Sequence, residues 1–362
     1  MPRINVTKSL LPDREKFHAY VDQILDSGWL TNRGPLVREF EEKLEDYLGV
    51  KNIVVVANGT LALQIAYKLL SLQGEVITTP FTFIATASSL KWEGLEPIFA
   101  DINKDTFNID TQNIIKKITS NTSAILPVHV FGNPCEVEAI DTIAKEHNLK
   151  VIYDAAHAFA VKYKGKSILH WGDISILSFH ATKLFHTIEG GALIIKDCDL
   201  YAQARKMVSF GFTGPESIHC LGINAKMNEF QAAMGLCLLD DINLAISRRA
   251  KITAMYDSIL SRILVKQTLA DNTIYNYGYY PVVFKDEATT KSVQNALNRK
   301  NIFPRRYFYP SLDTLKFLTD NQQATNSSDI ASRILCLPLS TELTDDECLA
   351  ISRIITQELR AE

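Results

Sequence analysis

The chain has 362 residues, 46% of them apolar and 22% charged, so it has enough apolar side chain for a large core and is not expected to be disordered. Its length favours two domains, or one large domain with a smaller one attached. The formal net charge of −3 argues against a nucleic-acid partner, because proteins that bind phosphate backbones normally carry a positive excess.

Membrane proteins and disulfide-rich proteins are disfavoured as well. The apolar runs are far shorter than the roughly 20 residues of a membrane-spanning helix, and residues 1–8 show no export signal. The six cysteines are scattered without a Cys-x-x-Cys pair, which argues against a disulfide framework and a thiolate zinc site. We therefore expect a cytoplasmic protein with reduced thiols and no membrane partner.

The first two-thirds of the chain alternates short apolar runs with longer amphipathic ones. Strands are predicted at residues 53–57, 75–79, 97–101, 124–130 and 151–154, with helices between them at 60–72, 84–92, 111–118 and 137–147. This alternation predicts an α/β domain with a largely parallel sheet. Val and Ile dominate the strands without strict alternation, which is typical of a sheet covered on both faces.

The pattern changes after residue 154. Strands predicted at 174–179 and 192–196 are separated by about a dozen residues, which is short for a helical crossover, so a mixed or antiparallel arrangement is expected here. A helical region at 227–255 is followed by weaker strands at 279–284 and 335–337, helices at 290–299 and 345–359, and a polar loop at 321–328. We expect a large domain at residues 1–245 and a smaller C-terminal α+β domain at 246–362.

Lys183 lies just beyond the predicted strand at 174–179, in an apolar stretch. Desolvation at such a place lowers the pKa of a lysine, and a neutral lysine is a nucleophile that can hold an aldehyde as a Schiff base. Taken alone, the position is explained more simply by a surface lysine at the end of a strand.

Two further features strengthen the functional interpretation of Lys183. Asp154 ends a buried strand, at the edge where α/β sheets bind ligands, and could pair with a protonated heterocyclic nitrogen; a helix cap or an ion pair is the alternative. At Gly59-Thr60 a strand gives way to a helix whose free amides could bind a phosphate, with a plain helix cap as the alternative. A reactive lysine, a strand-end aspartate and a phosphate site are what pyridoxal phosphate requires.

Short motifs occur along nearly the whole chain: SGWLT at 27–31, NGTLAL at 58–63, PFTFIAT at 80–86, PVHVFG at 127–132, DAAH at 154–157, SFHATK at 178–183 with EGG at 189–191, and NAKMNE at 224–229. In these motifs the sequence resembles the nucleotide-sugar aminotransferases of the DegT/DnrJ/StrS family. The resemblance implies the type I fold of pyridoxal-phosphate-dependent transferases, in which a large domain with a mostly parallel mixed sheet carries a small C-terminal α+β domain.

The resemblance also implies pyridoxal 5′-phosphate as cofactor and Lys183 as the catalytic residue that binds it. Asp154 would pair with the pyridine nitrogen. The other implied cofactor contacts are Gly59, Thr60 and Ser178 at the phosphate, Phe83 on the ring, His157 near the ring hydroxyl, and Asn224 from a second subunit. A related sugar dehydratase has histidine in place of Lys183, so the lysine favours transamination.

The resemblance implies a nucleoside-diphosphate keto sugar as substrate and L-glutamate as amino donor. Candidate substrate contacts are Thr31, His180, His186, Arg306 and Tyr307. In the run 302–310 two arginines beside aromatic residues could clamp a diphosphate, with a surface turn as the alternative. No His-x-x-x-His or His-Glu-x-x-His spacing occurs, so no metal is expected.

Residues 181–191 look closest to enzymes that aminate carbon 4 of a dTDP-linked 4-keto-6-deoxyglucose, which points to deoxyaminosugars such as those of lipopolysaccharide O-antigens. The alternatives are an aminotransferase for the 3-keto isomer and a non-catalytic relative that binds a sugar nucleotide. The resemblance further implies a homodimer with shared active sites.

The spacing of Phe230, Ala233, Met234 and Leu238 on the predicted helix offers an apolar face for such a dimer. The alternative is that this stripe packs inside its own domain.

Overall fold

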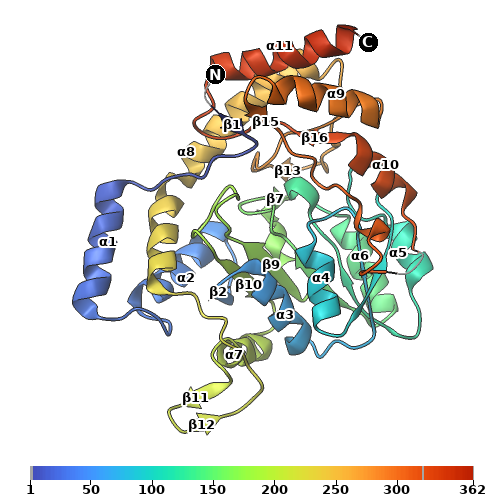
Figure 1. The fold of residues 1–362 in the computed structure, drawn as a ribbon. Helices are drawn as coiled ribbons and strands as arrows, with labels where there is room; N and C mark the ends of the chain where they lie inside the picture. The colour runs from blue at the N-terminus through green and yellow to red at the C-terminus, as the bar shows by residue number, and fades with distance from the viewer. Residues whose placement is uncertain (1–2, 320–321, 362) are drawn as a thin grey trace.

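The computed structural model describes residues 3–319 and 322–361. A seven-stranded sheet of order β2-β10-β9-β6-β5-β3-β4 lies at its centre (Figure 1). The strands are β2 (Ile53–Val56), β3 (Glu75–Thr78), β4 (Glu96–Phe99), β5 (Thr122–Leu126), β6 (Lys150–Asp154), β9 (Ile174–Ser178) and β10 (Gly191–Ile195). Every neighbouring pair is parallel except those of β10, which runs antiparallel to both β2 and β9. The predicted α/β class and mixed sheet are confirmed.

Helices cover both faces of this sheet. The helices of the large sheet region are α1 (Arg14–Ser27), α2 (Pro35–Leu48), α3 (Gly59–Leu69), α4 (Ala85–Trp92), α5 (Thr111–Lys117), α6 (Val137–Glu146) and α7 (Cys198–Met207). Successive strand residues point to opposite faces, so Val54 belongs to the core on the side of α3 and α7, while Val55 belongs to the core on the side of α2. Because both faces are buried, the strands read as continuous apolar runs.

Four helices between residues 59 and 146 lie where they were predicted, whereas α1, α2 and α7 were not predicted. The strand predicted at 124–130 ends at Leu126, and Pro127, which has no amide hydrogen to donate to a ladder, follows it. A short 3₁₀ turn, η1 (Val130–Gly132), occupies the remainder.

Helix α8 (Glu229–Leu260) is 32 residues long and joins two cores. By length and composition it could cross a membrane, but 56% of its most apolar window is buried inside the protein, as in the core helix of a globular protein. The stripe predicted as a dimer face is not available: Ala233 and Leu238 are fully buried and Met234 is 8% exposed. These side chains pack in their own core, so the alternative interpretation of the stripe is correct.

The second half of α8 packs with the C-terminal part of the chain. This part contains β13 (Thr273–Ile274), β14 (Pro281–Val283), α9 (Glu287–Asn298), β15 (Ile302–Phe303), η3 (Leu312–Thr314), α10 (Thr325–Arg333), β16 (Ile334–Cys336) and α11 (Asp345–Ala361). β14 and β16 pair antiparallel, and β1 (Ile4–Asn5) pairs parallel with β15. The division at residue 245 stays a prediction: it falls inside α8, and Ile4 belongs to the C-terminal core.

Two small elements complete the fold. β7 (Lys162–Tyr163) pairs with β8 (Lys166–Ser167), which leads into η2 (Ile168–His170), and with β13. β11 (Phe212–Gly214) and β12 (Ser217–Ile218) form a hairpin that extends away from the rest of the chain (Figure 1).

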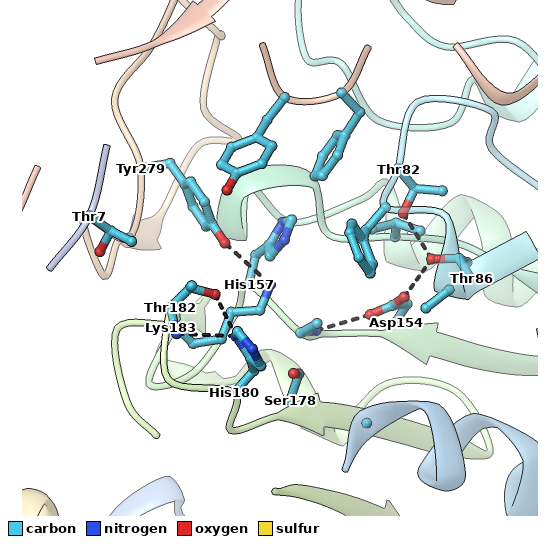
Figure 2. Close-up of a pocket in the computed structure, with 18 of the residues that line it drawn as sticks. Thr7, Thr82, Thr86, Asp154, His157, Ser178, His180, Thr182, Lys183 and Tyr279 are labelled. Carbon is cyan, nitrogen blue, oxygen red and sulfur yellow. Dashed lines mark hydrogen bonds between the residues drawn. The ribbon is translucent and has the colours of Figure 1, made fainter. Parts of the chain in front are cut away.

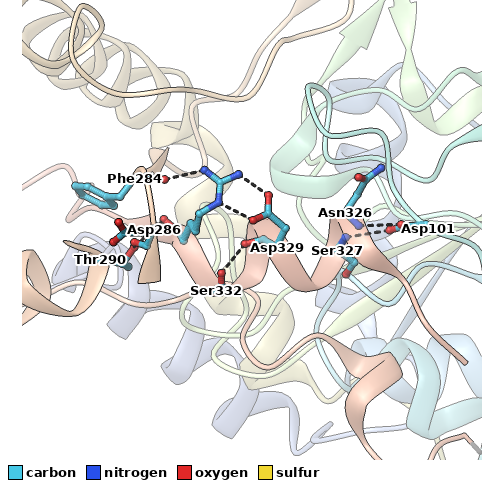
Figure 3. Close-up of polar contacts among 9 residues, drawn as sticks. Asp101, Phe284, Asp286, Thr290, Asn326, Ser327, Asp329 and Ser332 are labelled. Carbon is cyan, nitrogen blue, oxygen red and sulfur yellow. Dashed lines mark hydrogen bonds and ion pairs between the residues drawn. The ribbon is translucent and has the colours of Figure 1, made fainter. Parts of the chain in front are cut away.

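Helix α10 is held against the large sheet by Asp101, which follows β4. The Asp101 carboxylate accepts hydrogen bonds from the amides of Asn326 and Ser327, each at 2.9 Å (Figure 3). These contacts satisfy amides that have no partner within the helix. The prediction of a polar loop at 321–328 was therefore wrong for residues 325–328, which form the first turn of α10; residue 321 lies outside the described residues.

The other end of α10 leads into β16, which pairs with Arg305 through two backbone hydrogen bonds to Cys336 of 2.8 and 3.1 Å. Arg333, at this end, donates to the Phe284 carbonyl at 2.8 Å. Asp101 thus connects the large sheet to the segment that carries Arg305.

Candidate active site

A cavity of about 370 Å³ lies at the carboxyl ends of β6 and β9, beside the start of α3. Of the predicted site residues, Gly59, Thr60, Phe83, Asp154, His157, Ser178, His180, Lys183 and Tyr307 line it. Figure 2 shows Lys183 and Asp154 in this pocket, with Tyr279 above the lysine. Parallel strands bring their carboxyl ends to one edge of the sheet, so residues far apart in sequence meet here.

Asp154 ends β6 and is only 6% exposed. Its Oδ2 accepts a hydrogen bond from the Thr86 hydroxyl at 2.8 Å, and its Oδ1 accepts one from the Ala156 amide at 3.1 Å. Burial raises the pKa of the Asp154 carboxyl, while these hydrogen bonds and the charge of Lys183 oppose the rise. No ion pair joins Asp154 to a cation among the described residues, so this buried carboxylate suits a cationic ligand.

Lys183 lies in the loop after β9 and is half-buried. Its Nζ donates to the hydroxyl of Tyr279 at 3.3 Å. Burial lowers the pKa of Lys183, against the opposing effects of Asp154 and Tyr307. A lysine with a lowered pKa has a larger neutral fraction, which is the form that attacks a carbonyl.

An anion site lies at the start of α3. The side chain of Asn58 caps the amide of Leu61 at 2.9 Å, which leaves the amides of Gly59 and Thr60 without a partner inside the helix. A Cβ at Gly59 would lie 3.1 Å from Cβ of Ser178, so the Ser178 hydroxyl is beside these amides. Two free amides, the positive helix end and a hydroxyl form a site for a phosphate.

His157 and Phe83 line two further parts of the cavity. Nδ1 of His157 accepts from the Phe131 amide at 3.1 Å, so Nε2 carries the proton of the neutral ring. Burial lowers the pKa of His157 well below its usual value, which keeps the ring neutral. Phe83 is 57% exposed in the cavity mouth, an unusual exposure for a phenylalanine that nothing covers.

The side chains of two predicted substrate-binding residues, His186 and Arg306, bind other parts of the chain. His186 is 3% exposed, with Nε2 bonded to the Leu10 carbonyl at 2.8 Å and Nδ1 accepting from the Ile188 amide at 3.2 Å. Arg306 points away from the cavity, where it binds Glu287 at 3.0 Å and the Ser332 carbonyl at 2.7 Å. Neither residue lines the pocket, and both predictions are corrected: these side chains hold the fold.

Thr31 and Asn224 are exposed and lie outside the cavity of their own chain. The side-chain Oδ1 of Asn224 accepts a hydrogen bond from Lys226 Nζ at 2.8 Å. A contact from Asn224 to the site of a second subunit stays a prediction.

The cavity also contains residues that sequence reasoning missed, namely Thr82, Thr86, Tyr279, Arg305 and Phe308. Thr86 lies inside a sequence motif that does not indicate a partner for its hydroxyl, and the sequence places Tyr279 only at the start of the predicted strand 279–284. Phe308 stacks on His157 with ring centroids 5.6 Å apart and planes at 2°. Arg305, next to Arg306, is the arginine that faces the pocket.

Comparison with known proteins agrees with this geometry. Residues 12–356 match the model of the DegT/DnrJ/EryC1/StrS aminotransferase family. Two curated relatives carry the name dTDP-4-amino-4,6-dideoxy-D-glucose transaminase. The one from Shigella dysenteriae is 41% identical over 95% of each chain, and the one from Escherichia coli is 38% identical over 97% of this chain and 98% of its own. A crystal structure of DesI in the presence of its TDP-sugar product superimposes with a TM-score of 0.94 at 35% identity, covering 100% of this chain and 94% of that one.

The chain belongs to the DegT/DnrJ/EryC1/StrS aminotransferase family. It is therefore a pyridoxal-phosphate-dependent aminotransferase with the type I fold, as the resemblance implied. No cluster of three or more His, Cys, Asp or Glu side chains that could hold a metal occurs in the part of the chain that the structure describes.

The residues of this aminotransferase fit the cofactor. Asp154 is a buried carboxylate that forms no ion pair with a side chain in the described part of the chain, and a protonated pyridine nitrogen would supply a partner. The amides of Gly59 and Thr60 would bind the phosphate, and the exposed ring of Phe83 would cover the cofactor ring.

Proposed function

We propose that this aminotransferase converts dTDP-4-keto-6-deoxy-D-glucose to the 4-amino sugar, with L-glutamate as donor, in the biosynthesis of deoxyaminosugars for cell-surface polysaccharide. The observation that carries the proposal is the arrangement of Lys183, Asp154 and the α3 phosphate site in one cavity, in a chain 41% identical to a transaminase named for this sugar. The six free cysteines support a reducing, cytoplasmic location.

The residues of the cavity have separate tasks in this reaction. Bound pyridoxal phosphate supplies an aldehyde and an electron-withdrawing ring, which stabilises the charge left when a substrate carbon loses its proton. Asp154 keeps the ring nitrogen protonated, and His157 Nε2–H is available to the ring hydroxyl. Lys183 takes the proton from the carbon and returns it, as a general base and acid with a pKa lowered by burial.

The nucleotide end of the substrate would lie on the C-terminal side of the cavity. Arg305 is exposed at the pocket wall and suits a diphosphate, and the ring of Tyr307 lies 5.9 Å from its guanidinium. His180, exposed and 3.5 Å from Glu189, also lines the cavity and is available to a sugar hydroxyl.

A homodimer with shared sites is part of the proposal. Asn224 is exposed beside the β11–β12 hairpin, near several exposed apolar side chains: Phe212 (44%), Ile218 (66%), Leu221 (77%) and Ile223 (40%). Exposed apolar clusters of this kind are typical of protein interfaces. We propose that a second copy of the chain covers them and that its Asn224 contacts the α3 phosphate site.

The test is to incubate the purified enzyme with pyridoxal phosphate, L-glutamate and one keto-sugar nucleotide at a time. The panel contains the dTDP-linked 4-keto sugar, its 3-keto isomer, and the GDP-linked 4-keto sugar. Product mass and NMR identify the aminated carbon, and Lys183→Ala is the control that should form no product. Amination of the 3-keto isomer alone would support the alternative 3-aminotransferase.

Absence of product from every sugar, together with absence of a visible-range band from bound cofactor, would instead indicate a non-catalytic binding protein.

A further inference from the structure

We propose that Tyr279 is a further catalytic residue of this site, whose hydroxyl holds the amine of Lys183 in place and favours its protonated form. Figure 2 shows the hydroxyl directed at Lys183 Nζ, and the two atoms are 3.3 Å apart. The proposal rests on the proposed function only for the role of Lys183 as the proton carrier. The contact itself is a property of the folded chain.

The position of Tyr279 is fixed from two sides. Its ring lies against the rings of His157, at 4.7 Å, and Phe131, at 5.3 Å. The preceding residue, Gly278, accepts a hydrogen bond through its carbonyl from the buried side chain of Arg249 at 3.2 Å. Because the ring and the backbone are both held, the hydroxyl cannot leave Lys183 without disturbing the packing around His157.

A tyrosine hydroxyl can serve both states of a proton-carrying lysine. When Lys183 is an ammonium, it donates to the phenol oxygen; when Lys183 has given up its proton, the phenol O–H donates to the amine nitrogen. The lysine nitrogen therefore keeps a partner throughout proton transfer. The bond to the ammonium is charge-assisted and the stronger of the two, so it favours the protonated form.

This preference matters because burial favours the opposite state. Burial lowers the pKa of Lys183, and a base whose pKa falls too far below the working pH takes up protons poorly. Asp154 opposes the effect of burial electrostatically. Tyr279 opposes it by direct contact.

The other titratable groups around the two residues do not substitute for this contact. They are Asp154 and His157 near the sheet edge, Tyr307 and Cys336 in the C-terminal part, Arg249 and Tyr275 behind Tyr279, and His180 with Glu189 on the loop of Lys183. Burial keeps His157 neutral by lowering its pKa, and keeps Tyr279 and Tyr307 neutral by raising theirs. Tyr279 is thus a neutral acceptor that stays protonated while Lys183 titrates.

The test measures the ionisation of Lys183 without using the reaction. In full-length protein freed of cofactor, the rate of acylation of Lys183 is followed against pH by peptide mass spectrometry. Tyr279→Phe removes the hydroxyl but keeps the ring, and is expected to lower the apparent pKa of Lys183 by about one unit. Tyr256→Phe is the matched control, because its buried hydroxyl bonds the Pro338 carbonyl at 3.0 Å and not the amine of Lys183.

In the cofactor-loaded enzyme, Tyr279→Phe should lower kcat by about 10-fold and leave KM for the sugar nucleotide unchanged. A purely structural role would lower stability and activity alike, as in Tyr256→Phe, without moving the labelling profile. Identical profiles in wild type and Tyr279→Phe would overturn the proposal whatever the substrate. A shifted profile in a protein that aminates none of the sugars would retain the contact to Lys183 and reject only the proposed function.

Discussion

Replacing Thr86 with valine removes the side-chain hydrogen bond that opposes the rise in the pKa of Asp154. Thr86 is 1% exposed, and its hydroxyl donates to Asp154 Oδ2 at 2.8 Å in a buried setting. Valine keeps the branched shape of threonine but has no hydroxyl, so the carboxylate loses one donor. The buried Thr82 hydroxyl, which lies 2.9 Å from the Thr86 hydroxyl, loses its partner as well. Burial already raises the pKa of Asp154, and Thr86 is the first of the groups that counteract it.

The expected magnitude follows from the kind of bond that is lost. A hydrogen bond to a charged group contributes about 1.5–3 kcal/mol. At about 1.4 kcal/mol per unit, its loss raises the pKa of Asp154 by about one to two units. Burial places the pKa of Asp154 in the folded protein above its value in the unfolded chain. Below the unfolded pKa the carboxyl therefore stabilises the fold, and this contribution is lost as the pH rises through the folded pKa. Because Thr86→Val raises the folded pKa further, the pH range over which the contribution is lost extends upward in cofactor-free protein.

Cofactor binding gives the clearer measurement. The ionised Asp154 is the form that pairs with a protonated ring nitrogen, so binding weakens as pH falls and Asp154 takes up a proton. In Thr86→Val this acid limb of the cofactor dissociation constant should move upward by about one to two pH units. Ser89→Ala is the control, because this hydroxyl lies on the same helix and contacts Tyr67 at 2.9 Å but does not touch Asp154. The reasoning is refuted if the acid limbs of the two variants coincide.

Three further predictions test the catalytic lysine, the anchor of α10 and the shared site. Lys183→Ala should reduce turnover by more than about 10³-fold at an almost unchanged melting temperature, since the amine acts in chemistry and not in the core; substantial remaining turnover would remove Lys183 from the mechanism. Asp101→Ala leaves the amides of Asn326 and Ser327 uncapped and should lower the free energy of unfolding in urea by about 1–2 kcal/mol. The KM for the sugar nucleotide should rise while cofactor affinity stays unchanged. An unchanged free energy of unfolding would contradict the role of Asp101 as the anchor of α10. Mixing Lys183→Ala chains with Asn224→Ala chains should restore activity, because hybrid dimers contain one complete site. If mixing restores no activity and Asn224→Ala alone binds the cofactor with normal affinity, the active sites are not shared between subunits.

The main sheet and the centre of the site were predictable from sequence. Strands buried on both faces must be apolar throughout, so β2, β3 and β6 stand out as Val- and Ile-rich runs. Asp154 is the last residue of such a strand and Lys183 lies just beyond another, and residues in these places meet at one edge of a parallel sheet. Their meeting in one cavity needed no tertiary information beyond the α/β class.

The roles of residues adjacent in the sequence were harder to predict. From the run that contains Arg305 and Arg306, the sequence analysis selected Arg306 as the substrate contact, whereas Arg305 is the arginine that lines the cavity. Arg305 pairs through its backbone with Cys336, which directs its side chain to the pocket, while Arg306 binds Glu287. The apolar stripe on α8 likewise could not reveal whether its own core or a partner covers it, because both require the same side chains.

The sequence by itself determined the helices and strands and the residues that are able to take part in catalysis or binding, because periodicity and strand-end position are local properties of the chain. The tertiary structure alone decided which of those residues act in the site and which hold the fold. His186 lies near Lys183 in sequence, yet its ring is bound by Leu10, 176 residues away, while Tyr279, 96 residues away, contacts the lysine. Hydrogen-bond partners and burial set the pKa of each group, and for these residues both come from segments that meet only after the chain has folded.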